Sequence, residues 1–408
     1  MVAMSERTTC LVAGGGPAGM VLGLLLARAG VEVTVLEKHA DFLRDFRGDT
    51  VHPSTLTLLD ELGLGERFGK LPQSRLDTVS VPGPPALTIA DFRKLKVAHP
   101  YVAMVPQWDL LDLLAEAGRA EPTFHLRMNT EVTSLISEAG RVAGVRYRTA
   151  EGTTGEIRAD LTVGCDGRWS VVRREAGLRP REFPVPIDTW WFRLPRDGDE
   201  KAELTPGMRD GHFAVVIPRE GYFQIAYLAA KGLDGRLRAE GVEAFRDRIR
   251  KVLPQQADRV DAITSMDDVK HLDVRLNLLP RWHREGVLCI GDAAHAMSPI
   301  GGVGINLAVQ DAVATARLLA GPLRRGRVSG GDLERIRRRR LLPTLVVQAI
   351  QRTMHRMVIR PVIEGRRNGP PRALVAVMNA IPVARRIPAY VIGVGLLPEH
   401  APKWARRD

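Results

Sequence analysis

A glycine-rich turn near the start of the chain constrains the fold most. Residues 8–13 are apolar enough for a buried strand, and they run into Gly14-Gly15-Gly16-Pro17-Ala18-Gly19, which matches G-x-G-x-x-G. In such a turn the first glycine permits a tight bend, the second lets a diphosphate approach the backbone, and the third lets the next helix pack on the sheet. A helix over 20–29 and a strand over 31–36 follow. The pattern predicts an α/β fold that binds a dinucleotide.

An acidic residue stands at the end of the second expected strand. Glu37 follows Gly19 by 18 positions, close to where a carboxylate accepts a hydrogen bond from a ribose 2′-hydroxyl. A carboxylate there disfavours a nucleotide with a 2′-phosphate. The motif therefore predicts FAD or NAD at this site, and not NADP, without separating the first two.

A second strand-turn-helix pattern with glycines in its turn lies late in the chain. Residues 287–290 are continuously apolar, as in a buried parallel strand, and Gly291-Asp292 follows. The Asp292 carboxylate is expected at the carboxyl edge of the sheet, where it can accept hydrogen bonds from sugar-like hydroxyls. Pro299 to Gly304 holds three glycines in six residues, so a flat ligand can lie on its backbone. A helix over 306–319 would direct its positive start at that loop and favour an anion such as a reduced flavin. The alternative is an ordinary strand-loop-helix crossover.

The middle of the chain changes to strand alternation. Strands are expected over 187–193, 212–217 and 222–228, with a helix over 242–253, which together predict a mixed β-sheet. Its large aromatic residues are Trp190, Trp191, Phe213, Phe223 and Tyr227. Alternation places about half of them on each face, and the register that decides which is not readable from the sequence. Core packing is the default interpretation for each.

Charge and cysteine content exclude several classes of protein. The net charge of +12 is concentrated from Arg317 onward, where 20 Lys and Arg face 5 Asp and Glu. A solvated helix face is the main interpretation, with an acidic surface or peripheral membrane contact as the alternative; nothing indicates specific nucleic-acid recognition. The three cysteines, in apolar runs without metal or disulfide spacing, are expected to be reduced, and no metal site is expected. Without a signal pattern or a spanning segment, the expected location is the cytoplasm.

A third motif adds a family resemblance. An expected strand over 161–164 ends in Cys165-Asp166-Gly167, with Ser170 and Arg173 following. With G-x-G-x-x-G before it and Gly291-Asp292 after it, the chain resembles the class A flavoprotein monooxygenases of the para-hydroxybenzoate hydroxylase type. The three markers occur in order, and the agreement in organisation covers about 300 residues.

The resemblance implies a fold and a division into domains. The fold would be α/β, a Rossmann-like GR2-type FAD-binding fold with a mixed β-sheet substrate domain and C-terminal helices. Residues 5–75, 101–180 and 274–320 would form the FAD-binding domain. Residues 76–100 and 181–273 would form the substrate domain, and 321–408 a helical region that is too short and too helical for the thioredoxin-like domain of larger phenol hydroxylases.

The resemblance also assigns site residues. Arg47 and Gln107, which the local pattern leaves as a surface charge and a helix cap, would line the flavin, and Asp292 would bind a ribityl hydroxyl. The implied FAD contacts are Gly14, Gly16, Pro17, Ala18, Gly19, Glu37, Lys38, Arg47, Gln107, Val132, Asp166, Gly167, Asp292, Pro299, Gly301, Gly302, Val303, Gly304, Ile305 and Asn306. Substrate contacts are expected at Trp191, Phe213 and Tyr227. No residue presents itself as a catalytic acid or base, and His295 is expected to be structural.

The implied activity is that of an FAD-dependent monooxygenase. NADPH or NADH would act as a transient electron donor, and O₂ would yield a flavin C4a-hydroperoxide that hydroxylates or epoxidises an aromatic, polyketide-like or other electron-rich molecule. The partners would be this small molecule and O₂. Two alternatives stay open at this point: a flavin-dependent dehydrogenase or reductase of a prenyl or polycyclic substrate, and a non-catalytic flavin or nucleic-acid binder.

Overall fold

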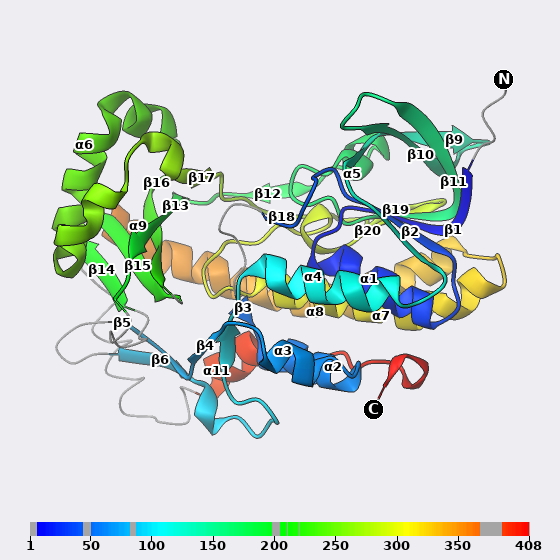
Figure 1. Cartoon of the computed structure of the whole chain (residues 1–408), viewed down its shortest axis with the longest axis horizontal. Helices are drawn as coiled ribbons and strands as arrows, with labels where there is room; N and C mark the ends of the chain where they lie inside the picture. The colour runs from blue at the N-terminus through cyan, green and yellow to red at the C-terminus, as the bar shows by residue number, and fades with distance from the viewer. Residues whose placement is uncertain are drawn as a thin grey trace.

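An eight-stranded sheet carries the glycine-rich turn. The computed structural model describes residues 6–43, 50–81, 87–197, 205–209, 211–219, 221–367 and 386–407 (Figure 1). The strands run in the order β19 (His283–Arg284), β20 (Val287–Cys289), β11 (Thr154–Gly164), β1 (Glu6–Ala13), β2 (Val33–Leu36) and β8 (Phe124–Arg127), with β10 (Arg141–Thr149) and β9 (Thr130–Glu138) paired beyond β11.

The central strands of this sheet are parallel, from β20 to β8. Ala13 is level with Gly164 and with Leu36, and Gly164 is level with Cys289. The carboxyl ends of β1, β2, β11 and β20 therefore meet at one edge, which is where ligands bind in open α/β sheets. Every motif singled out in the sequence begins at this edge.

Helices α1 (Pro17–Arg28), α4 (Gln107–Arg119) and α7 (Gly304–Arg324) pack with this sheet around the main core. Figure 1 shows them side by side along one face. Helix α1 is apolar on all sides and almost wholly buried, because it lies between the sheet and its neighbouring helices. Helix α8 (Gly330–Met354) runs along α7 and continues through a π-helical turn, His355–Ile359, into α9 (Arg360–Ile363).

A second, fully antiparallel sheet forms the other end of the molecule (Figure 1). Its order is β14 (Thr205–Arg209), β15 (His212–Pro218), β16 (Tyr222–Ala230), β13 (Ile187–Pro195) and β17 (Lys270–Leu272). Helix α6 (Asp234–Val252) covers one face and kinks at Gly241, whose φ of 83° is left-handed. Two short paired strands, β12 (Arg181–Phe183) and β18 (Leu276–Leu278), lie where the chain passes between the two sheets.

Smaller elements surround the region between the sheets. Strands β3 (Thr50–Val51), β7 (Val102–Met104) and β4 (Ser74–Leu76) form one small sheet, and β5 (Thr78–Val81) pairs with β6 (Leu87–Asp91). The short helices are α2 (Pro53–Glu61), α3 (Gly65–Gly69), α5 (Val171–Glu175) and α11 (Arg386–Gly393).

A terminal strap, residues 397–405, closes over the N-terminal helices. Arg28 of α1 donates from Nη1 to the carbonyl of Leu62 at 2.9 Å and to that of Ala405 at 2.8 Å. Glu61 of α2 accepts from the backbone N–H of Ala401 at 2.7 Å. The strap therefore joins two elements from the first 61 residues to residues more than 300 positions later.

The predicted fold class is confirmed. Strand β8 ends at Arg127, and β9 begins at Thr130. Asn129 between them has a φ of 53°, a left-handed conformation that ends strand pairing. The division into domains by residue range stays a prediction. Within the described residues, no helix combines the length and apolarity needed to cross a bilayer.

Candidate functional site

The three glycines that match the motif in the glycine-rich turn have different surroundings. Gly14 has a φ of +103°, and a Cβ there would lie 2.5 Å from the carbonyl oxygen of Cys165. A Cβ on Gly19 would lie 2.0 Å from the carbonyl oxygen of Gly14. A Cβ on Gly16, the residue that precedes α1, would meet no atom within 4 Å. Two glycines are thus required by packing, and the third faces space beside the start of a helix, which fits a diphosphate.

Glu37 directly follows β2 beside this turn and is buried. Its Oε2 accepts from the N–H of Gly15 at 2.8 Å, and its Oε1 accepts from the N–H of His39 at 3.0 Å. The carboxylate is therefore held at the carboxyl end of the strand, the position from which such a group accepts hydrogen bonds from ribose hydroxyls. Lys38, also expected at the cofactor, is exposed next to it.

The Asp166 motif is built as a helix cap. Asp166 accepts from the Ser170 hydroxyl at 2.5 Å and from the N–H of Val172 at 3.0 Å, and Ser170 in turn caps α5 by accepting from the N–H of Arg173 at 2.9 Å. Burial raises the pKa of Asp166, and these hydrogen bonds oppose the rise. Gly167 has a φ of +78°, which favours glycine at this turn.

Arg173 joins the Asp166 motif to the turn that contains Gly291 and Asp292. It is buried, and it donates to the carbonyl of Ala293 at 3.1 Å and to that of Arg168 at 2.6 Å. The two turns that follow β11 and β20 are therefore held at a fixed separation. The sequence showed Arg173 in its motif, but its partner 120 positions away carries no local signal.

A buried ionic cluster supports the Gly291-Asp292 turn. Asp311 of α7 accepts from the N–H of Gly291 at 3.1 Å, from His295 Nε2 at 2.6 Å, and from Arg340 Nε at 3.0 Å. His295, Asp311 and Arg340 are each at most 1% exposed. Glu399 of the terminal strap lies 3.8 Å from Arg340 and also pairs with Arg317 and Arg339. His295 thus lies in a closed structural cluster, and the adjoining Asp292 side chain, 31% exposed, is left at the sheet edge.

The glycine loop is clamped on both sides. Thr50 donates from its hydroxyl to the Gly302 carbonyl at 3.0 Å, and a Cβ on Gly302 would lie 2.7 Å from that hydroxyl. From α8, Gln351 donates to the carbonyls of Ser298 and Ile300, each at 2.9 Å, and His355 is 2.9 Å from the Ser298 hydroxyl. These contacts were not predictable from the sequence, because they join elements far apart in the chain.

Helix α7 begins at Gly304, two residues before the predicted start at Asn306, and its free N–H groups face this loop. The hydroxyls of Ser54 and Thr55 donate to Asn306 Oδ1 at 2.8 and 3.0 Å, which fixes the orientation of the buried amide. The segment that holds Pro299, Gly301, Gly302, Val303, Gly304, Ile305 and Asn306 is therefore held in place from both sides, and three of these seven residues have no side chain.

The remaining expected cofactor residues, apart from Arg47, lie in three different elements. Gln107 is the first residue of α4, and Val132 is buried in β9. Pro17 and Ala18 form the first turn of α1. Arg47 lies outside the described residues.

Strand register separates the three expected substrate residues. Trp191 is opposite Ala226, and Phe213 is opposite Leu228, so these four share one face. This face joins Met297, Ile300 and Val303 of the glycine loop in one apolar cluster. Tyr227 lies on the other face, packed with Trp190 and with Phe245 of α6. Tyr227 therefore points away from the loop, and the choice of Tyr227 as a substrate contact does not fit this register.

Trp191 carries a buried donor on the loop-facing side. Its indole Nε1 has no hydrogen-bond partner among the described residues. The equivalent N–H of Trp190, on the α6 side, donates to Asp234 at 2.8 Å. Since a buried N–H without a partner is costly, Trp191 is suited to a ligand acceptor.

A parallel sheet whose edge carries these turns, together with an antiparallel sheet at the other end of the molecule, defines a dinucleotide-binding oxidoreductase with two ligand regions. The family comparison specifies it: the model described as "FAD binding domain" matches residues 7–349, and the chain belongs to this family of flavin monooxygenases. The residues at the edge fit FAD, since Gly16 leaves room for a diphosphate while Glu37 and Asp292 offer acceptors to hydroxyls. The chain is an FAD-dependent monooxygenase that uses NAD(P)H.

Named relatives agree with this assignment. The chain is 34% identical over 371 residues to 6-methylpretetramide 4-monooxygenase of Streptomyces rimosus, covering 86% of this chain and 85% of that one. It is 34% identical over 328 residues to the 12-dehydrotetracycline 5-monooxygenase/anhydrotetracycline 6-monooxygenase of the same species, covering 75% of this chain but only 61% of that protein. The predictions of family, FAD and enzyme class are confirmed.

Solved structures show the same fold. The anhydrotetracycline hydroxylase OxyS of Streptomyces rimosus has a TM-score of 0.76 at 24% identity, over 95% of this chain and 76% of that one. PqsL of P. aeruginosa, in complex with 2-aminobenzoylacetate, has a TM-score of 0.75 at 20% identity, over 92% and 100%.

Removal of the Asp292 carboxylate is expected to weaken FAD binding. If Asp292 accepts a ribityl hydroxyl, Asp292→Ala should cost roughly 1.5–3 kcal/mol, the usual size for a hydrogen bond to a charged group. The FAD dissociation constant of the refolded or desalted apoprotein measures this, with the exposed Asp267→Ala as a control. Unchanged affinity in Asp292→Ala would assign Asp292 to structure alone.

Two buried histidines predict an acid-sensitive fold. Burial lowers the pKa of His52 and of His355 from 6.5 to about 4. Both pKa values are depressed in the folded state, so the unfolded chain binds protons first and stability falls as the pH drops from 6.5 toward 4. For His52 the loss should reach roughly 2 kcal/mol by about pH 5. Urea unfolding at neutral pH and at about pH 5 should show a smaller difference in His52→Gln; an equal difference would contradict the assignment.

Proposed function

We propose that the enzyme hydroxylates a planar, polycyclic aromatic compound of the polyketide type. The observation that carries this proposal is the loop-facing side of the second sheet, where Trp191 and Phe213 meet Met297 and Ile300 in one apolar cluster. Flat, largely apolar rings suit such a surface, and one buried N–H supplies a fixed orientation. The relative named 6-methylpretetramide 4-monooxygenase, matched over 86% of this chain, supports the substrate class.

The residues divide the work between binding and orientation. Bound FAD supplies the reductive activation of O₂. Gly16, Glu37 and Asp292 hold its diphosphate and sugar-like parts, while the loop from Pro299 to Gly304 provides a wall that excludes water. Trp191 Nε1 would donate to a carbonyl or phenolic oxygen of the substrate and set which ring carbon faces the flavin.

The product identifies the reaction. Purified enzyme with FAD, NADPH or NADH, and labelled O₂ is mixed with a series of aromatic polyketides, and the products are analysed by mass. A product that gains one labelled oxygen atom supports hydroxylation or epoxidation. A product that loses two hydrogens without the label, for every substrate turned over, would identify a dehydrogenase instead.

Trp191→Phe is expected to raise KM for such a substrate. The change keeps an aromatic ring but removes the N–H, so the loss should be about fivefold, the size of one neutral hydrogen bond. Trp190→Phe is the matched control because the same change is made on the α6 side of the same strand, where the N–H is bonded to Asp234. If Trp190→Phe raised KM about fivefold and Trp191→Phe left it unchanged, the substrate would lie on the opposite face of the sheet from the one proposed.

We also infer a cytoplasmic location, which the cysteines support. Cys10, Cys165 and Cys289 are unpaired, and Cys10 and Cys289 are buried, as in proteins of reducing compartments. Contact of the arginine-rich region after Arg317 with an acidic surface stays a prediction. Sedimentation with anionic vesicles would test it.

A further inference from the structure

We infer that Arg168 is a positioning residue that ties the Asp292 carboxylate to a charge cluster in the substrate sheet, so that this sheet contributes to the affinity for FAD. The hinge cluster is defined as Lys231, Asp188, His271 and Asp273. The inference rests on the assignment of Asp292 to the cofactor site. It adds a link between the two sheets that neither motif contains.

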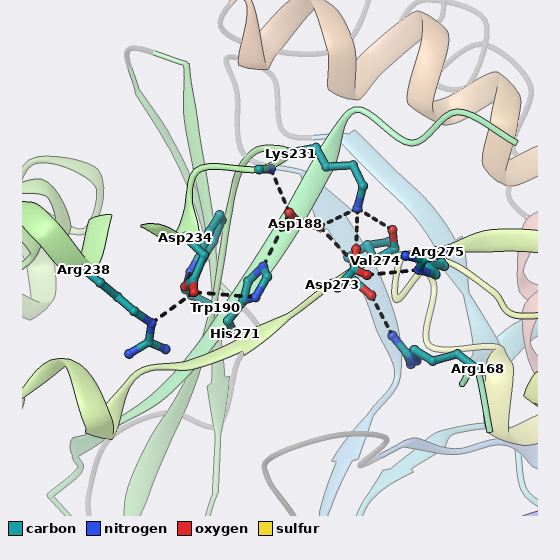
Figure 2. A network of polar contacts seen from close by, with 11 residues as sticks. Arg168, Asp188, Trp190, Lys231, Asp234, Arg238, His271, Asp273, Val274 and Arg275 are labelled. Atoms are coloured by element: carbon teal, nitrogen blue, oxygen red, sulfur yellow. Dashed lines mark hydrogen bonds and ion pairs between the residues drawn. The ribbon is translucent and has the colours of Figure 1, made fainter. Parts of the chain in front are cut away.

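Lys231 is the centre of the hinge cluster. Its Nζ donates to Asp188 Oδ1 at 2.8 Å, to Asp273 Oδ1 at 2.7 Å and to the Val274 carbonyl at 2.8 Å (Figure 2). Asp188 is the second residue of β13, which follows β12, and Asp273 lies just before β18. One ammonium group therefore fastens the two chain segments that cross between the sheets.

Asp188 gives the cluster its rigidity. Its side chain is 3% exposed and accepts from the N–H groups of Gly232 at 2.9 Å and Val274 at 3.0 Å, in addition to Lys231. His271 of β17 lies 3.4 Å from the same carboxylate. A buried carboxylate with this many donors has little freedom to move, so the position of Asp273 beside it is well defined.

Arg168 connects this cluster to the cofactor edge. Its Nη1 donates to the Asp273 carbonyl at 3.2 Å, and its Nη2 lies 3.5 Å from Asp292 Oδ2. The side chain is only 15% exposed, and Arg173 holds its backbone carbonyl. In the part of the chain that the structure describes, Arg168 is the only side chain that pairs with Asp292. The orientation of the Asp292 carboxylate thus depends on the contact between Arg168 and Asp273 of the hinge cluster.

The far side of the network offers a matched control. Asp234 is bonded by Trp190 at 2.8 Å and by Arg238 at 3.0 Å, and Figure 2 places this pair on the opposite side of the cluster from Arg168. Arg238 and Lys231 are similarly accessible, at 38% and 39%; Arg238 pairs with Asp234, and Lys231 pairs with Asp188 and Asp273. Of these two changes, only the loss of Lys231 should alter the orientation of the Asp292 carboxylate.

The test is a double-mutant cycle on the FAD dissociation constant, measured by fluorescence titration of the apoproteins. Arg168→Met and Lys231→Met are each expected to weaken FAD binding roughly fivefold, and the double variant no more than the weaker-binding single, since both changes break one chain of contacts. Arg238→Met should stay within about twofold of the parent. Lys231→Arg, which keeps the charge, should restore most of the affinity.

Several results would overturn the inference. If the fold-changes in the FAD dissociation constant multiply in the double variant, Arg168 and Lys231 act independently. If Lys231→Met leaves that constant unchanged, the hinge cluster does not contribute to FAD binding. If Lys231→Met fails to fold, Asp273→Asn in combination with Arg168→Met provides the second cycle, read in the same way. A parent protein that binds no FAD would instead refute the cofactor assignment, which separates the two failures.

Discussion

The Gly16→Val variant is expected to purify without FAD while remaining folded. Gly16 has a φ of −74° and a ψ of −177°, values that valine adopts, so the fold itself tolerates the change. Its Cβ enters space that no protein atom occupies within 4 Å, and that space is needed by the diphosphate. Visible flavin absorbance relative to protein absorbance, after desalting, is the measurement.

Gly235→Val provides the control for this experiment. Gly235 also has open space at its Cβ position, but it lies in α6, on the far side of the second sheet. This variant should keep its FAD. A yellow Gly16→Val protein with parental FAD content would show that the diphosphate does not lie over this turn.

The second large effect is expected from Arg340→Met. The change leaves the Asp311 carboxylate with one ionic partner fewer in a fully buried cluster, and Glu399 loses a neighbouring charge. Breaking a buried ion pair costs about 3–5 kcal/mol, so the midpoint of denaturant unfolding should fall strongly. His295 and the N–H of Gly291 remain as partners of Asp311.

Arg338→Met is the matched comparison on the same helix. Arg338 is 76% exposed and pairs with Glu334 at the surface, where ion pairs contribute little. Equal stability losses in the two variants would mean that the buried cluster contributes no more than a surface pair. FAD binding provides a second measurement. Because Asp311 holds the N–H of Gly291, Arg340→Met should also lower the affinity for FAD.

The parts of the site that were predictable are those that local backbone chemistry dictates. Gly14, Gly16 and Gly19 were assigned from spacing, because a strand-turn-helix with a bound diphosphate requires glycine at those points. Asp292 was found from its place after a buried strand, and Asp166, which also follows one, was assigned through the family resemblance. Parallel pairing then brings them to one edge without further information.

The parts that were missed depend on contacts between distant segments. Arg173, Gln351 and Arg340 contact partners 29 to 120 positions away, and an arginine or glutamine on a helix gives no sign of such a partner. The face on which Tyr227 lies was not predictable for a different reason: Tyr227 is next to Ala226, and a shift of one residue in a strand exchanges the two faces of the sheet.

The terminal strap has a consequence for how the chain acquires its fold. Arg28 and Ala405, which bond directly, are 377 positions apart, and at about 5–20 residues per second a ribosome needs about 20–75 s to add the residues between them. Until then α1 lacks part of its cover, and strand β20 with its Asp292 turn is itself made only late. We therefore expect that FAD enters after synthesis of the strap, and that ribosome-bound chains ending before residue 397 do not retain the cofactor.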